Sequence, residues 1–157
     1  MEEKTNVMRL LESKKLKFNS FFYGSGEAQS AVDVAAELGQ DCKRVFKTLV
    51  TQGKSKSYYV FVIPGEAELD LKKAAKAVGE KSVAMIKSKE LLPLTGYIHG
   101  GCSPIGMKKY FRTVVHETAK EFETIFFSGG KIGCQVEMSP EDLGKIIRIE
   151  FEDVAVF

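Results

Sequence analysis

The sequence predicts an α+β protein in which helices surround a mixed, curved β-sheet. Short β-branched and aromatic runs alternate with short amphipathic patterns, and two of the runs are joined by a polar loop, as in a hairpin. The strict strand–helix–strand alternation of a doubly wound parallel sheet is absent. The 157 residues suit one domain with one core, over residues 1–157. We expect the glycine-rich loops to lie together at one open end of the curved sheet.

Helical patterns and strand-like runs succeed one another in the first half of the chain. Ser30 and Asp33 are spaced as in a capping box, and Gly39 suits the C-terminal cap of the helix that follows Ser30. Pro64 and Gly65 end an apolar run. The expected elements are a helix in 4–15, a strand in 16–23, a helix ending at 38, a hairpin of 45–51 and 57–63, and a helix over 69–78.

Shorter elements are expected in the second half. Pro93 is expected to stop a short helix, whereas Ser139 and Pro140 suit the first positions of another. The expected elements are a strand in 82–86, a helix in 88–92, a strand in 112–116, a helical turn in 118–122, strands in 124–128 and 133–138, a helix over 139–145 and a strand in 147–151.

Composition argues against several classes of protein. The start of the chain is polar and carries acids, and no apolar run approaches membrane-spanning length, so we expect no signal peptide, no membrane partner and a cytoplasmic location. Cys42, Cys102 and Cys134 are too few and too widely spaced for a disulfide framework, which suits a reducing compartment. No Cys/His spacing is typical of a zinc site, so neither a metal nor a cofactor is expected.

Lysine and arginine form clusters although the net charge is only +2. Clusters that share one face could follow a phosphate backbone. Charge alone favours the simpler interpretation, an ordinary solvated surface. The clusters are Lys43, Arg44 and Lys47; Lys54 and Lys56; Lys72, Lys73 and Lys76; and Lys108, Lys109 and Arg112.

Two glycine-rich loops are the most distinctive motifs. One runs over 100–109 (GGCSPIGMKK) and the other over 128–133 (SGGKIG). Glycine allows backbone N–H groups to turn towards a ligand, and successive N–H groups form an anion-binding concavity to which lysine adds charge. Two such loops favour a pocket for a carbonyl, carboxylate or phosphate group. The alternative is a pair of strand-connecting turns.

Several motifs, in order and spacing, resemble the YbaK/EbsC proteins, which are similar to the editing domain inserted in bacterial prolyl-tRNA synthetases. The likeness extends from about Val7 to Phe151. The motifs are FKTL at 46–49, LDLKK at 69–73, TGY at 95–97 and the two glycine-rich loops.

This resemblance implies a barrel-like sheet and a trans-acting hydrolase that deacylates misacylated tRNA, with Cys-tRNA(Pro) as the substrate. It implies tRNA as the partner, with prolyl-tRNA synthetase beside it. An editing site is needed because a proline pocket separates similar small side chains by only about 1–3 kcal/mol. The resemblance also implies that no protein group attacks: the substrate's own thiol or the ribose 2′-hydroxyl does so, while the protein holds the geometry.

The candidate site residues follow from the motifs together with the resemblance. Lys47 lies mid-strand, on the same face as Leu49, and matches the family's important lysine; a solvated strand lysine is the alternative. Its predicted role is to position the terminal nucleotide or to stabilise the oxyanion. The predicted catalytic set is Lys47, Gly100 and Gly101, and the predicted substrate-binding set is Tyr23, Thr48, Ser103, Pro104, Ser128, Gly129 and Gly130.

Cys102 is not expected to be a nucleophile, since nothing near it in sequence would lower the pKa of its thiol. Ser30 is interpreted as a helix cap. The chain departs from its apparent relatives at Ile132, where many have arginine, and at Gln135, where an aspartate is common. These departures keep two alternatives open: editing of Ala-tRNA(Pro) or another small-residue tRNA, and a module that binds tRNA ends without hydrolysis.

Overall fold

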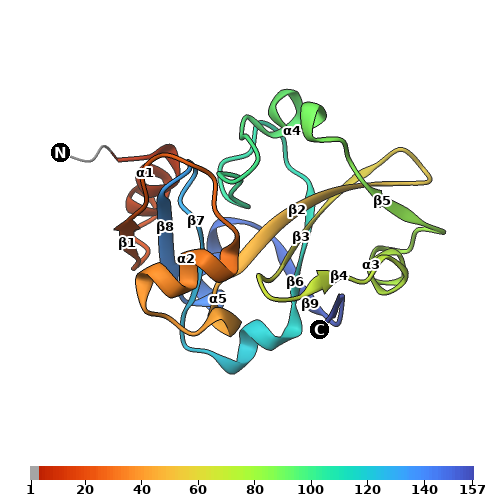
Figure 1. Ribbon diagram of the computed structural model, residues 1–157. Helices are drawn as coiled ribbons and strands as arrows, with labels where there is room; N and C mark the ends of the chain where they lie inside the picture. The colour runs from red at the N-terminus through yellow and green to blue at the C-terminus, as the bar shows by residue number, and fades with distance from the viewer. Residues whose placement is uncertain (1–3) are drawn as a thin grey trace.

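A computed structural model describes residues 4–157 as an α+β fold, as predicted (Figure 1). Met1–Glu3, part of the polar start from which no signal peptide is expected, lie outside the described residues. No helix within residues 4–157 is long and apolar enough to cross a membrane.

The largest sheet has five strands in the order β5-β2-β3-β6-β9. β2 pairs antiparallel with β3 and β5, whereas β6 runs parallel to both β3 and β9, so the sheet is mixed as predicted. Its strands are β2 (Phe46–Gly53), β3 (Tyr58–Pro64), β5 (Val83–Met85), β6 (Arg112–His116) and β9 (Ile149–Glu152).

A second sheet of three strands, in the order β1-β8-β7, lies beside the first. An isolated bridge between Val45 and Phe126 connects the two. The sheets do not close into a barrel; the resemblance suggested a more barrel-like arrangement than the strand pairing produces. The smaller sheet contains β1 (Asn19–Phe22), β7 (Ile125–Ser128) and β8 (Cys134–Met138).

Within residues 4–157 five α-helices surround the sheets, and two of them begin at a side-chain cap that the sequence predicts. The hydroxyl groups of Ser30 and Ser139 accept N–H bonds at the starts of α2 and α5, and Asp70 does so at the start of α3. The helices are α1 (Asn6–Ser13), α2 (Ala31–Leu38), α3 (Leu71–Val78), α4 (Ser88–Thr95) and α5 (Pro140–Ile146); 3₁₀ turns cover Cys42–Arg44 and Glu117–Glu121.

Two element predictions were wrong in detail. α4 continues past Pro93 to Thr95, because Leu91 and Thr95 are buried and the Thr95 hydroxyl donates to Leu91 O at 2.7 Å. α3 begins at Leu71 rather than at Leu69, which belongs to β4 (Glu68–Leu69). β4 pairs with β10 (Ala155–Val156), and neither two-residue strand was expected.

The central strand β3 has two buried faces. Val60 and Val62 pack into a core shared with α1, α5 and the smaller sheet, whereas Phe61 and Ile63 pack beneath α3 and the C-terminal segment. This division follows from the two-residue alternation of side chains along a strand. The sheet is therefore rigid where β2, its neighbour, carries the candidate site.

Candidate functional site

The candidate site lies where the two sheets separate. β2 pairs with β5 only over Thr51–Gly53, and the bridge to β7 lies at Val45, immediately before β2. Within residues 4–157 no strand pairs with the intervening edge, Phe46–Val50. A pocket of about 360 Å³ opens along this edge.

Six parts of the chain line this pocket, and they are far apart in sequence. They are the residues around the start of α2, the first half of β2, the turn after β3, α4, the first glycine-rich loop and the smaller sheet. The lining residues are Tyr23, Gln29, Ser30, Ala31, Val34, Phe46, Lys47, Thr48, Leu49, Gly65, Leu91, His99, Gly100, Cys102, Ser128 and Gln135.

Lys47 provides a half-buried cation in the pocket. Its Nζ donates to the carbonyl of Gly65 at 3.3 Å. Burial lowers the pKa of Lys47, and the negative charge of Glu68 opposes this shift. An ammonium group has three N–H donors, so a partly dehydrated Lys47 can bind an oxygen of a ligand more strongly than a solvated lysine can.

Two buried polar atoms in this pocket have no hydrogen-bond partner. They are Thr48 Oγ1 and Gln135 Oε1; Thr118 Oγ1, which lies elsewhere, is the third such side-chain atom within residues 4–157. The Gln135 side chain is held from its other end, because Nε2 donates to the hydroxyl of Tyr23 at 3.4 Å. An unsatisfied buried acceptor costs about 1–3 kcal/mol. Two of them among the residues that line one pocket therefore indicate a ligand that supplies donors.

The backbone of Thr48 also faces the open edge. Val50 O accepts from Ile86 N on the β5 side of β2, and successive residues of a strand direct their backbone groups to opposite edges. Thr48 is two residues from Val50, so its N–H and C=O point to the same side. This places one backbone donor beside Thr48 Oγ1.

The two glycine-rich loops pack directly against each other, as the pocket hypothesis requires. A Cβ on Gly101 would lie 3.0–3.1 Å from backbone atoms of Lys131 and Ile132, so any other residue here would press the two loops apart by a few tenths of an ångström. Gly100 lines the pocket with a φ of +89°, and a Cβ there would lie 2.7 Å from Ala28 Cβ. At both positions, close packing by itself explains why the residue is glycine.

Several N–H groups of these loops are used within the fold. Gly101 N donates to Ile98 O at 3.0 Å, Gly129 N to Cys134 O at 2.9 Å, and Gly130 N to Ser128 Oγ at 3.1 Å. Ser103 is fully buried, and its Oγ accepts from Ile105 N at 3.3 Å. These groups are turn contacts in the present conformation.

The structure thus brings half of the predicted site residues together. Tyr23, Lys47, Thr48, Gly100 and Ser128 line the pocket. Gly101, Ser103, Gly129 and Gly130 do not line it and make hydrogen bonds within the loops, and Pro104 lines a separate cavity of about 210 Å³.

Other lining residues were not predicted as site residues. Ser30 caps α2, as predicted, and also lines the pocket. Gln29, Leu91 and His99 have no local signal, although His99 directly precedes Gly100. The sequence did draw attention to Gln135, because glutamine replaces the aspartate that is common there in the apparent relatives.

Cys102 lines the pocket but is 8% exposed, and burial raises the pKa of its thiol to about 12. The thiol therefore stays protonated near neutral pH, in keeping with the prediction that it is not a nucleophile. None of the three cysteines forms a disulfide.

Comparison with known proteins identifies the family of the chain. Residues 25–146 match the family model described as an aminoacyl-tRNA editing domain. EbsC of Enterococcus faecalis, whose name gives it as a Cys-tRNA(Pro)/Cys-tRNA(Cys) deacylase, is 46% identical over 154 residues, which cover 98% of this chain and 94% of EbsC. A proline–tRNA ligase of Fervidobacterium nodosum is 30% identical over 80 residues, which cover 51% of this chain and 14% of the ligase.

The fold has a counterpart of nearly the same extent among solved structures. A crystal structure described as a trans-editing enzyme for prolyl-tRNA synthetase aligns with a TM-score of 0.83 at 23% identity, covering 99% of this chain and 100% of the other. The family model spans most of the chain, and EbsC matches nearly all of it. The chain therefore belongs to the aminoacyl-tRNA editing domain family.

Proposed function

We propose that this protein is a trans-acting aminoacyl-tRNA deacylase that removes cysteine from Cys-tRNA(Pro). The observation that carries the proposal is a pocket lined by one half-buried cation, Lys47, and by two residues with buried oxygens without partners, in a chain of the editing family. The name of EbsC supports the choice of substrate.

The pocket suits the end of a charged tRNA. Its volume of about 360 Å³ is near the lower limit of small-molecule sites, about 300–1,000 Å³, and so suits one aminoacylated nucleotide rather than a duplex. In this proposal Thr48 Oγ1 and Gln135 Oε1, which have no partner within the protein, accept hydrogen bonds from the α-ammonium group of the amino acid.

The substrate thiol is the attacking group in this proposal. Its sulfur bonds to the ester carbonyl carbon, the C–O bond to the ribose breaks, and the 3′ oxygen leaves with the thiol proton. Water then opens the resulting thiolactone and releases cysteine. Lys47 and the N–H of Thr48 stabilise the negative charge that develops on the carbonyl oxygen. The hydroxyl of Tyr23, whose pKa is raised by burial, remains a neutral hydrogen-bonding group.

The direct test is release of amino acid from a panel of charged tRNAs. We expect hydrolysis of Cys-tRNA(Pro) and retention of alanine on Ala-tRNA(Pro), because alanine has no thiol. Release of alanine at a similar rate would show an editor of small residues that does not use a substrate thiol. Binding of charged tRNA with no release of any amino acid would show a binding module.

Lys47→Ala is expected to reduce the rate of deacylation by about 10²–10³-fold, the usual loss when one oxyanion donor is removed. The measurement is single-turnover hydrolysis of Cys-tRNA(Pro). Lys43→Ala, at an exposed lysine outside the pocket, is the matched control and should keep the parent rate. An unchanged rate in Lys47→Ala would remove this residue from the mechanism.

The proposal places the protein in the cytoplasm, where tRNA is charged, with tRNA as its partner. A joint complex with prolyl-tRNA synthetase is part of the proposal, supported by the likeness to a segment of proline–tRNA ligase. Faster deacylation of Cys-tRNA(Pro) when the synthetase is added would support this partnership.

A further inference from the structure

The charges of this protein are strongly segregated. The residues 53–57 and 71–89 contain eight of the 23 lysines and arginines but only one of the 21 acids, so they carry +7, and the rest of the chain carries −5. We call these two segments the basic end. Its lysines are Lys54, Lys56, Lys72, Lys73, Lys76, Lys81, Lys87 and Lys89, all exposed.

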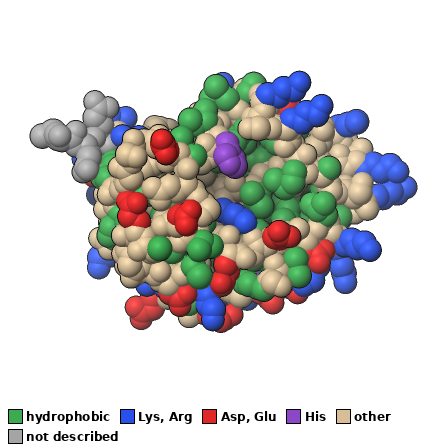
Figure 2. Space-filling model, in the orientation of Figure 1, with side chains coloured by type: hydrophobic (Ala, Val, Ile, Leu, Met, Phe, Trp, Pro, Cys, Tyr) green, Lys and Arg blue, Asp and Glu red, His purple; other side chains and the backbone are tan. Residues whose placement is uncertain are grey.

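These segments meet in space although they are separate in sequence. β5 pairs with the end of β2, and Lys54 N donates to Ser82 O at 3.0 Å. Figure 2 shows the lysine and arginine side chains gathered at the end of the molecule that, in Figure 1, holds the β2–β3 turn, α3 and β5. The acidic side chains concentrate away from this end.

The single acid of the basic end is used within the fold. The carboxylate of Glu80 accepts hydrogen bonds from Ser55 N at 3.1 Å and from the Tyr59 hydroxyl at 2.6 Å, and also from the Ser55 hydroxyl. Gly53 makes room for it, since a Cβ there would lie 2.3 Å from the carboxyl carbon. Glu80 therefore holds α3 and β5 against the hairpin turn, and both of its carboxylate oxygens accept hydrogen bonds from the protein.

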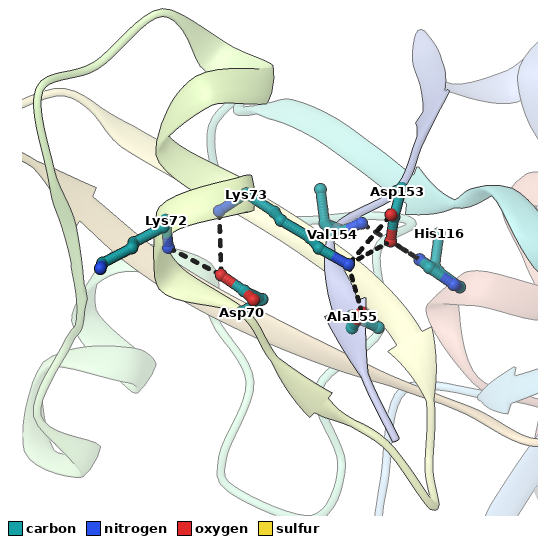
Figure 3. Close-up of polar contacts among 7 residues, drawn as sticks. All are labelled: Asp70, Lys72, Lys73, His116, Asp153, Val154 and Ala155. Atoms are coloured by element: carbon teal, nitrogen blue, oxygen red, sulfur yellow. Dashed lines mark hydrogen bonds and ion pairs between the residues drawn. The ribbon is translucent and has the colours of Figure 1, made fainter.

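Seven of the eight lysines remain available for a partner. Within residues 4–157 only Lys73 of this group forms an ion pair, with Asp153 at 3.0 Å. Figure 3 shows it directed towards the C-terminal segment, where it also donates to Ala155 O. A row of unpaired, exposed cations is the usual footprint of nucleic-acid phosphates.

The basic end is joined to the pocket by two continuous elements. Lys47 lies near the start of β2 and Gly53 at its end, a path of about 20 Å at the rise of a β-strand. α4 begins directly after Lys87, carries Lys89 in its first turn and contributes Leu91 to the pocket. A nucleic-acid strand whose end occupies the pocket therefore reaches these lysines within a few nucleotides.

We propose that the basic end binds the phosphate backbone of the tRNA acceptor stem, and that β2 and α4 direct the stem from this surface to the pocket. This inference rests on the proposed function for the position of the 3′ end. The lysines contact phosphates rather than bases, so they supply affinity and orientation without reading the sequence.

The test is binding of an uncharged acceptor-stem minihelix with a single-stranded 3′ end, measured by fluorescence anisotropy at increasing salt. The triple variant Lys54→Gln/Lys81→Gln/Lys89→Gln should make the slope of log K against log salt shallower by about 2–3, and should weaken binding at low salt by roughly tenfold or more. The control Lys14→Gln/Lys17→Gln/Lys43→Gln changes net charge equally at exposed sites outside the basic end and should leave the slope near its parent value.

A second measurement separates this inference from the deacylase proposal. The triple variant should raise the KM for Cys-tRNA(Pro) while leaving hydrolysis of the small ester cysteinyl-adenosine unchanged. If the parent protein hydrolyses neither substrate but binds the minihelix through these lysines, the deacylase proposal fails and the RNA surface stands.

Three outcomes would overturn the inference. The first is an equal effect of both triple variants on minihelix binding, and the second is no effect of either. The third is that the basic-end lysines are needed for binding an acidic protein or anionic lipid vesicles but not for binding RNA.

Discussion

At the scale of single residues, the unpartnered oxygen of Thr48 is the most informative feature of the pocket. Thr48→Val removes this oxygen at nearly constant volume. It should leave the free energy of unfolding unchanged or raise it, because a buried acceptor without a partner is lost. Deacylation should nevertheless slow, because the substrate loses a contact. The measurements are urea unfolding and kcat/KM for Cys-tRNA(Pro).

Thr118 provides the matched control for this prediction. Its Oγ1 is also buried without a partner, but it lines a different cavity of about 350 Å³ near Phe122 and Phe157. Thr118→Val should have a similar effect on stability and none on deacylation. Equal activity in the two variants would mean that Thr48 Oγ1 is not a substrate contact.

At the scale of elements, the cap of α3 has a measurable role. The Asp70 carboxylate accepts from Lys72 N and Lys73 N, both at 3.0 Å, at the start of the helix that carries part of the basic end. Asp70→Ala should lower the free energy of unfolding by about 0.5–2 kcal/mol, whereas Asp70→Asn, which keeps an oxygen acceptor, should lose less. Equal losses in the two variants, measured by urea unfolding, would show that the cap hydrogen bonds are not the cause.

At the scale of the whole molecule, His116 connects the large sheet to the C-terminal segment (Figure 3). The residue is 3% exposed, and its Nδ1 accepts from Val154 N at 3.2 Å, which requires the neutral imidazole. Burial lowers the pKa of His116; Asp153, Glu117 and Glu121 oppose this shift, and Lys73 adds to it.

This lowered pKa predicts acid sensitivity of the fold. The unfolded chain binds a proton at His116 more readily than the native protein does, so acid favours unfolding. The stabilisation should be complete above the ordinary histidine pKa of about 6.5 and should be lost as pH falls through the lower native value. Urea unfolding from pH 7 to pH 5 measures this slope. His116→Gln should flatten it, and an unchanged slope would assign the acid sensitivity to other groups.

Local chemistry explains why most elements could be predicted. Ser30, Asp70 and Ser139 cap helices by contacts within three residues, and Gly39 ends α2 in a left-handed conformation. β4 and β10 could not be found in this way, because each has two residues and exists only through pairing with the other, far away in sequence. Burial of Leu91 and Thr95, also a long-range effect, carried α4 past Pro93.

The sequence by itself determined the α+β class, most helices and strands, the family likeness and the candidacy of Lys47, because caps, alternation and motifs are short-range patterns. Only the tertiary structure decided which candidates share a pocket: it brought Gln135 and His99 to the pocket and left Gly101 and Ser103 out of its lining. It also gathered separate lysines into one basic end. These placements depend on the pairing along β2, whose end pairs with β5, whereas Val45, just before its start, bridges to β7 of the smaller sheet. Such long-range pairing leaves no local pattern in the chain.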